Sequence, residues 1–95
     1  MIIRSQDKKI VLNFANITDL NINTTKKDES EIIACFPYSI IDDCGYNKIG
    51  TYSTEKKAIK VLDMIQKAYS KANYYFISNG FVQNVFFEMP QDSEV

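Results

Sequence analysis

The most regular hydrophobic pattern in the chain lies in its second half, over residues 58–76. Apolar residues recur there every three or four positions, which places their side chains on one face of an α-helix. They are Ala58, Val61, Leu62, Ile65, Ala68, Tyr69, Ala72 and Phe76. Lys56, Lys60, Lys67 and Lys71 fall on the opposite side. The pattern predicts an amphipathic helix over about 54–77, with Ser53 or Thr54 as N-cap and Asn79-Gly80 as its stop.

The other segments are shorter, rich in β-branched and aromatic residues, and typical of strands. In the segment 17–25, Leu20 and Ile22 alternate with polar residues, so one face of that strand is expected to be in water. The segment 31–36 is apolar on both faces, which favours a central strand. The predicted strands cover residues 1–4, 9–14, 17–25, 31–36, 46–52 and 81–88.

This order of elements, strands followed by one helix and one more strand, predicts an α+β fold. We expect a mostly antiparallel sheet of about five or six strands, covered by the long helix of the C-terminal half. The chain has 95 residues, which is enough for one hydrophobic core and not for two. The prediction is therefore a single domain over residues 1–90, with 91–95 as a flexible tail.

Charge and cysteine content exclude several classes of function. A net charge of −1 argues against general binding to long nucleic acids or to anionic membranes. No apolar run approaches the ~20 residues of a membrane span, and no secretion signal is expected at the N-terminus. Cys35 and Cys44 fit neither a CxxC pair nor a zinc site, and the chain has no histidine. We expect a cytoplasmic protein with reduced thiols and no cofactor.

Catalysis is not expected from this sequence, because it contains no known nucleophile, phosphate-binding or metalloprotease motif. The adjacent carboxylates Asp42 and Asp43 fall in a predicted loop. Adjacency alone neither holds a metal nor tunes a pKa, so a solvated loop is the simpler interpretation.

Three features are candidates for binding, each with a plainer structural alternative. The lysines of the helix form an ordinary solvent face, or Lys56 and Lys57 join the free N–H groups at the helix start to hold a phosphate. Arg4 is the only arginine, and it forms a surface salt bridge or clamps a phosphate or carboxylate. The six tyrosines belong to the margin of the core, or they stack on bases or on a protein partner.

Apolar residues outside the predicted core stripe indicate self-association. Ile59 and Met64 flank the stripe on the helix, and Phe86 and Phe87 give the last strand two apolar faces. Excess apolar surface on a small domain often marks a contact between copies, so a homodimer is expected.

Several blocks of the sequence resemble a family of small proteins of phages and prophages of low-GC Gram-positive bacteria. The blocks are Ile3-Arg4-Ser5-Gln6-Asp7-Lys8, Gly50-Thr51-Tyr52-Ser53-Thr54-Glu55, Ala58, Val61-Leu62-Asp63 with Ile65-Gln66, and Val85-Phe86-Phe87-Glu88-Met89-Pro90. The general plan of a sheet with a covering helix is also similar to the Thoeris anti-defence proteins of phages. Those proteins sequester cyclic ADP-ribose isomers or cyclic oligonucleotides between protomers without catalysis.

The resemblance implies a homo-oligomer in the cytoplasm of an infected or lysogenic bacterium that sequesters a cyclic nucleotide signal. In that hypothesis Arg4, Lys56 and Lys60 contact phosphate, Tyr52 stacks on a base and Asn84 donates hydrogen bonds. The alternative is a protein-interaction module that inhibits a host defence factor or acts in phage regulation. There the tyrosines and the aromatic residues of the last strand would form the contact surface.

Overall fold

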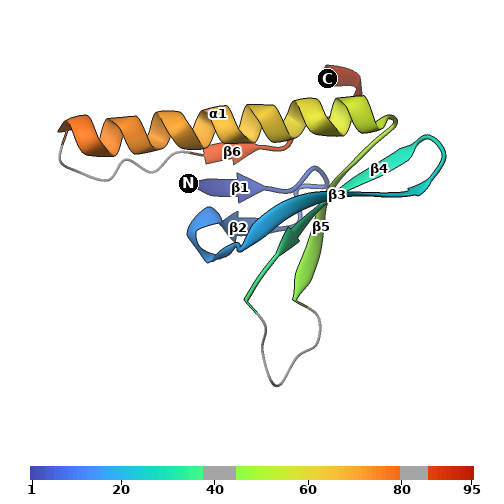
Figure 1. The fold of residues 1–95 in the computed structure, drawn as a ribbon, viewed down its shortest axis with the longest axis horizontal. Helices are drawn as coiled ribbons and strands as arrows, with labels where there is room; N and C mark the ends of the chain where they lie inside the picture. The colour runs from blue at the N-terminus through green and yellow to red at the C-terminus, as the bar shows by residue number, and fades with distance from the viewer. Residues whose placement is uncertain (38–44, 80–85) are drawn as a thin grey trace.

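Six strands and one long helix make up the part of the chain that the computed structural model describes (Figure 1), namely residues 1–37, 45–79 and 86–95, without the side chains of 25 and 72–79. The helix α1 spans Glu55–Asn79. The strands are β1 (Ile2–Arg4), β2 (Val11–Asn13), β3 (Asp19–Lys26), β4 (Glu29–Cys35), β5 (Tyr46–Tyr52) and β6 (Phe86–Glu88). Two short 3₁₀ turns, η1 (Phe14–Asn16) and η2 (Asp92–Glu94), complete the described elements.

The strands form two three-stranded sheets, with the orders β2-β1-β6 and β3-β4-β5. The α+β class is confirmed, but the prediction of one sheet of five or six strands is corrected. The reason lies at the edge of β5 that is not paired with β4, where Gln6 takes the place of a neighbouring strand. The Gln6 N–H donates to the Ile49 carbonyl at 2.8 Å, and the Thr51 N–H donates to Gln6 Oε1 at 2.8 Å. One residue caps that edge, so the ladder does not continue into the first sheet.

The sheet β2-β1-β6 joins the two ends of the chain. β1 and β2 form an antiparallel hairpin, with Arg4 opposite Val11. β6 lies parallel to β1 on its other side, with Arg4 level with Glu88. The second sheet is antiparallel throughout, and β4 is its central strand as predicted.

The predicted amphipathic character of α1 is confirmed from Ala58 to Ala68, whereas Tyr69, predicted in the same apolar stripe, is 40% exposed. Thr54 is the N-cap, because its hydroxyl accepts the Lys57 N–H at 3.1 Å. Ala58, Val61 and Ile65 are buried and pack against the second sheet and Met89, in one core that also includes Ile3 and Leu12. Each large side chain buried there stabilises the fold by about 1.5–3 kcal/mol.

The last residues of the chain are ordered against the fold, which corrects the prediction of a loose tail over 91–95. The Asp92 carboxylate accepts the Ser53 N–H at 2.8 Å, and the Lys57 ammonium donates to the Asp92 carbonyl at 3.0 Å. Val95 packs against the core. The physical reason is that a carboxylate is stabilised next to the positive end of a helix and beside a lysine, and Asp92 lies there, just before the N-cap.

Within the described residues, no helix is long and apolar enough to cross a membrane.

Candidate functional site

The clearest candidate for a contact surface is the side of the sheet β2-β1-β6 that faces away from the core. Side chains alternate along a strand, so Ile3 points into the core while its neighbours point outward. The strand register aligns them with outward residues of β2 and β6. We call this surface the outer face, and it comprises Ile2, Arg4, Val11, Phe86 and Glu88.

Large apolar side chains on the outer face are exposed to water. Val11 is 60% exposed and Phe86 is 74% exposed, the highest value among the exposed large hydrophobic residues. Together with Phe87, the outer face lines a shallow cavity of about 280 Å³. Exposed apolar surface with a charged rim marks a place where a partner binds.

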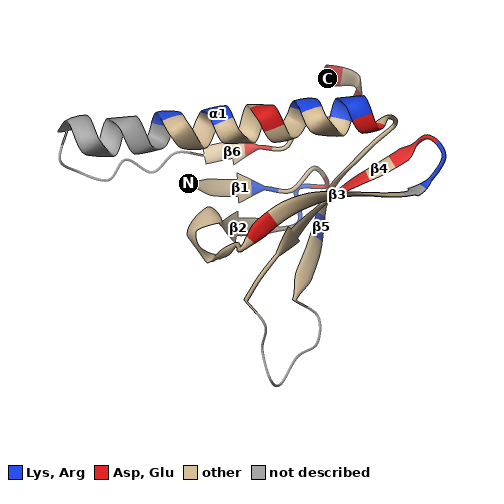
Figure 2. Cartoon of the chain, viewed as in Figure 1, with Lys and Arg blue, Asp and Glu red and all other residues tan. Residues whose placement is uncertain are grey.

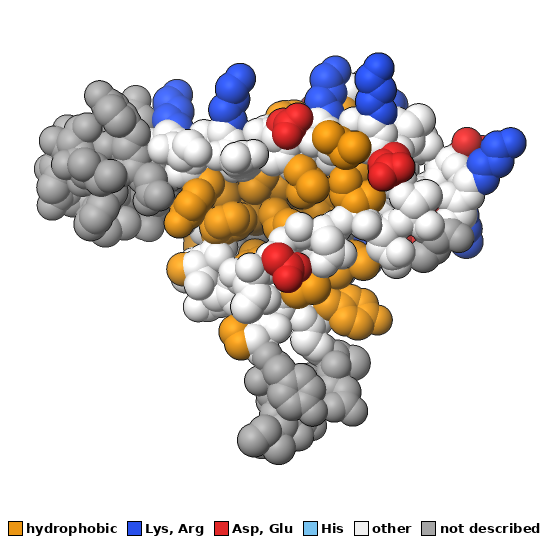
Figure 3. Space-filling view, viewed as in Figure 1, with side chains coloured by type: hydrophobic (Ala, Val, Ile, Leu, Met, Phe, Trp, Pro, Cys, Tyr) orange, Lys and Arg blue, Asp and Glu red, His pale blue; other side chains and the backbone are white. Residues whose placement is uncertain are grey.

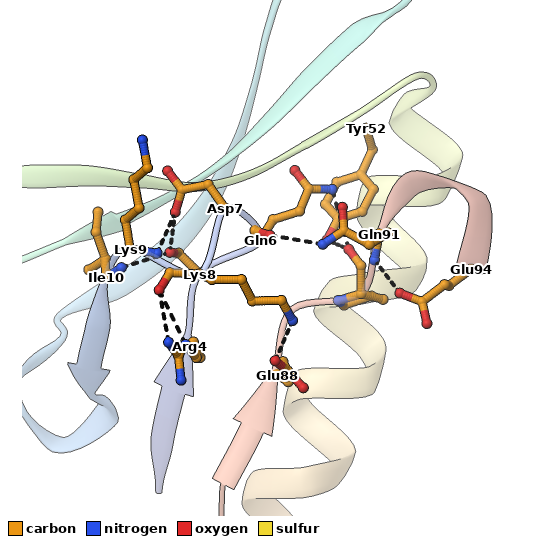
Figure 4. Close-up of polar contacts among 12 residues, drawn as sticks. Arg4, Gln6, Asp7, Lys8, Lys9, Ile10, Tyr52, Glu88, Gln91 and Glu94 are labelled. Carbon is orange, nitrogen blue, oxygen red and sulfur yellow. Dashed lines mark hydrogen bonds and ion pairs between the residues drawn. The ribbon is translucent and has the colours of Figure 1, made fainter.

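Hydrogen bonds and an ion pair connect the charged residues Arg4, Lys8 and Glu88 on and beside this surface. The Arg4 guanidinium donates to the Lys8 carbonyl through Nε and Nη2, at 3.3 and 3.1 Å. The Lys8 ammonium forms an ion pair with the Glu88 carboxylate (Figure 4). This hydrogen bond from Lys8, and then the positive charge of Lys8, lowers the pKa of Glu88 below its ordinary value. The outer face therefore presents both signs of charge next to exposed carbon.

A second polar cluster, which we call the junction, lies where the two sheets and the C-terminal segment meet. The Gln6 side-chain amide donates to the Thr51 carbonyl at 3.0 Å and to the Pro90 carbonyl at 3.3 Å. The Gln91 side chain donates to the Gln6 carbonyl at 2.8 Å. Figure 4 shows Gln6 between the chain before β2 and the segment after β6, with Tyr52 beside it. The junction is satisfied by its own hydrogen bonds.

The turn that follows β1 is built by short polar side chains. Ser5 is buried, and its hydroxyl donates to Asp7 Oδ1 at 2.6 Å and accepts the Ile10 N–H at 3.0 Å. That hydrogen bond from Ser5, followed by one from the Lys9 N–H, lowers the pKa of Asp7. Lys8 has a φ of 69°, and this left-handed conformation reverses the chain toward β2. The turn thus fixes the backbone to which Arg4 is bound.

The structure places Tyr52 in the core. Its side chain is 1% exposed, and its hydroxyl donates to the Pro90 carbonyl at 2.8 Å. Burial, followed by the negative charges of Asp92 and Glu94, raises the pKa of Tyr52 to about 12. The prediction that Tyr52 stacks on a base is wrong, because the ring is already covered by protein. The helical spacing after Tyr52 predicted the helix, but it carried no information on which tyrosine is buried.

The predicted cations are not brought together. Lys56 and Lys60 are exposed, and the lysines of α1 form a row along the side of the helix that points away from the sheets (Figures 2 and 3). Arg4 lies on the outer face, where it lines a cavity to which none of these lysines contributes. The proposed phosphate position at the helix start is filled by the chain itself, since Asp92 takes the Ser53 N–H and the Lys57 ammonium. Asn84 lies outside the described residues, as do Asp42 and Asp43.

The described titratable groups whose pKa values shift do not resemble catalytic acids or bases. The pKa values of Asp7, Glu88 and Asp92 all move downward, for Asp92 mainly because its carboxylate accepts the Ser53 N–H. Each carboxylate is thereby held in the charged form that stabilises the fold. In the described part of the chain, no group of three or more acidic or cysteine side chains could hold a metal ion.

Comparisons with protein families, with curated proteins and with solved structures found no match for this chain.

Proposed function

We propose that this chain is a protein-interaction module that acts without catalysis, and that the outer face is its contact surface. The observation that carries this proposal is the exposure of Phe86 and Val11 on a sheet whose other side is core. Aromatic residues and arginine are the types enriched where protein partners bind, and Phe86 and Arg4 line the same cavity here.

The kind of partner is suggested by the sequence blocks that resemble phage and prophage proteins. A phage protein of this size that binds without catalysis would act on a protein of its bacterial host, such as a defence factor. The neighbouring charges of Arg4 and Glu88 suit a partner that presents an apolar side chain flanked by charges of both signs.

Affinity capture from a bacterial lysate tests the proposal with three forms of the tagged chain. They are the wild type, the outer-face variant Val11→Thr with Phe86→Thr, and the control Lys56→Ser with Lys60→Ser. Threonine is a β-branched residue that suits a strand, and it removes apolar surface at both positions. We expect mass spectrometry to identify a protein that the wild type and the lysine control retain and the outer-face variant loses. Retention of the same proteins by all three forms would contradict the proposal.

Sequestration of a cyclic nucleotide is the second candidate, and one observation favours it. The Arg4 guanidinium and the Phe86 ring line the same cavity, so a phosphate and a base could be bound within one site. Its volume of about 280 Å³ is just below the usual range of small-molecule sites, which favours a ligand that is only partly enclosed.

A thermal-shift panel of cyclic nucleotides separates the two candidates. A ligand at about 100 times its dissociation constant adds about 2.7 kcal/mol to the free energy of unfolding. In this second candidate the gain is lost in Arg4→Gln and kept in Lys56→Ser with Lys60→Ser. A panel that leaves the melting temperature unchanged removes nucleotide sequestration and leaves the protein contact.

A further inference from the structure

The two edges of the sheet β3-β4-β5 differ in a way that the proposed function does not use. At the edge formed by β5, Gln6 supplies both a backbone N–H and a side-chain amide, and these bind the backbone of Ile49 and Thr51. Such pairing blocks the addition of another strand. At the edge formed by β3, no described residue outside β4 makes a backbone hydrogen bond to residues 19–26.

The open edge is long and regular. β3 has eight residues, and its pairing with β4 is unbroken from Asp19 to Asn23, before a register shift that ends at Lys26. This regular part has no proline, lysine or bulge, which are the features that commonly protect an edge. In Figure 1, β3 lies on the near side of its sheet with no other element drawn in front of it. An edge strand points the N–H and C=O groups of every second residue away from the sheet.

The side chains of this strand are self-complementary about Ile22. Asn21 and Asn23 flank it on the exposed side of the sheet, while Leu20 and Ile22 are half-buried on the core side. When a strand pairs antiparallel with a copy of itself about Ile22, Asn21 lies opposite Asn23 of the second copy. The Asn21 amide nitrogen donates to Asp19 Oδ1 at 3.0 Å within its own strand, and its amide oxygen can accept from the Asn23 amide of the second copy. Ile22 then lies opposite Ile22 of the second copy, so apolar side chains meet on the core side.

Charge along the strand favours the same antiparallel arrangement. The strand begins at Asp19 and ends at Lys26, which is followed by Lys27 in the turn. Antiparallel pairing brings the acidic start of each copy toward the basic end of the other, whereas parallel pairing would place like charges together. Lys26 is 76% exposed and makes only a long ion pair of 3.8 Å with Glu29, which leaves its ammonium accessible.

We propose that the partner of this edge is a second copy of the chain, and that two β3 strands pair antiparallel about Ile22. The result is a two-fold symmetric dimer with one six-stranded sheet. A contact of this kind is isologous, since the same residues contribute from both copies. It uses a different sheet from the outer face, so it does not depend on the proposed function.

A pair of matched charge variants tests this register. In Asn21→Lys with Asn23→Lys, lysines face lysines across the two-fold axis at both symmetric positions. In Asn21→Lys with Asn23→Glu, each lysine faces a glutamate of the other copy. Both variants change the same two exposed positions, and thermal melts check that each remains folded.

Sedimentation equilibrium over a wide range of concentration gives the dimer dissociation constant of each form. We expect the wild type to dimerise, the lysine–lysine variant to dissociate about tenfold more readily, and the lysine–glutamate variant to match or exceed the wild type. Added salt should bring the two variants closer together. A wild type that stays monomeric, or equal dissociation constants for all three forms, would overturn the proposal.

Discussion

The junction and the outer face are both polar in part, yet they differ in what their polar groups contact. In the junction, the amide of Gln6 donates to the carbonyls of Thr51 and Pro90, and the hydroxyl of Tyr52 also donates to the Pro90 carbonyl. On the outer face, Phe86 and Val11 are exposed. The hydrogen bonds of the junction therefore stabilise the fold, whereas the apolar side chains of the outer face are available to a partner.

This comparison gives the sequence blocks a structural explanation. Gln6 comes from the first block, Thr51 and Tyr52 from the second and Pro90 from the last, and the structure joins all of them at the junction. Gly50 belongs there too, because a Cβ at that position would lie 3.0 Å from the Tyr52 ring and 3.1 Å from Met89 Cε. These residue types are explained by packing and hydrogen bonding, without a ligand.

The largest effect is expected from Gln6→Ala, which removes the residue that connects the two sheets. Three side-chain hydrogen bonds are lost, and the Thr51 N–H and carbonyl lose their Gln6 partner. The free energy of unfolding should fall by about 2–4 kcal/mol. Chemical denaturation measures this value, and Gln91→Ala, which loses one exposed hydrogen bond to Gln6, should cost much less.

A smaller loss is expected from Tyr52→Phe, which keeps the ring in the core and removes only the hydroxyl. The Pro90 carbonyl retains its second donor, the Gln6 amide at 3.3 Å. The free energy of unfolding should fall by about 1 kcal/mol, or about 4–8 °C in melting temperature for a domain of this size. An unchanged melting temperature would show that this hydrogen bond does not stabilise the junction.

A pH-dependent effect is expected from Asp92→Asn. Because folding lowers the pKa of Asp92 below its usual 3.8, its carboxylate stabilises the protein above that pH and loses this contribution as the pH falls through the lowered pKa. The wild type should therefore melt at a higher temperature than Asp92→Asn at neutral pH. The difference should disappear in acid, and a difference that is constant with pH would contradict this role for the charge.

The sequence predicted the periodic elements well. The helix, the region of its N-cap and the central position of β4 follow from hydrophobic periodicity and local propensity, and the structure confirms them, with Thr54 rather than Ser53 as the cap. Such patterns report which face of an element is apolar, and that is a local property.

The division into two sheets and the role of the last residues could not be read in this way. They depend on contacts between residues more than 30 positions apart, such as Gln6 with Thr51 and Ser53 with Asp92. A glutamine in a turn and an aspartate near the end of a chain carry no local signal of such contacts. The same limit explains the error at Tyr52, since its hydroxyl is bound by the Pro90 carbonyl, 38 positions further along the chain.

The smallest effect on stability, and the most direct test of the comparison, is expected from the outer-face variant Val11→Thr with Phe86→Thr. Both side chains are mostly exposed, so its free energy of unfolding should lie within about 0.5 kcal/mol of the wild type. The deciding measurement is therefore its denaturation curve, recorded on the same preparation that is used for partner capture. We predict an unchanged curve with a lost partner. A curve shifted by several kcal/mol would show instead that the outer face belongs to the core, and would contradict the account.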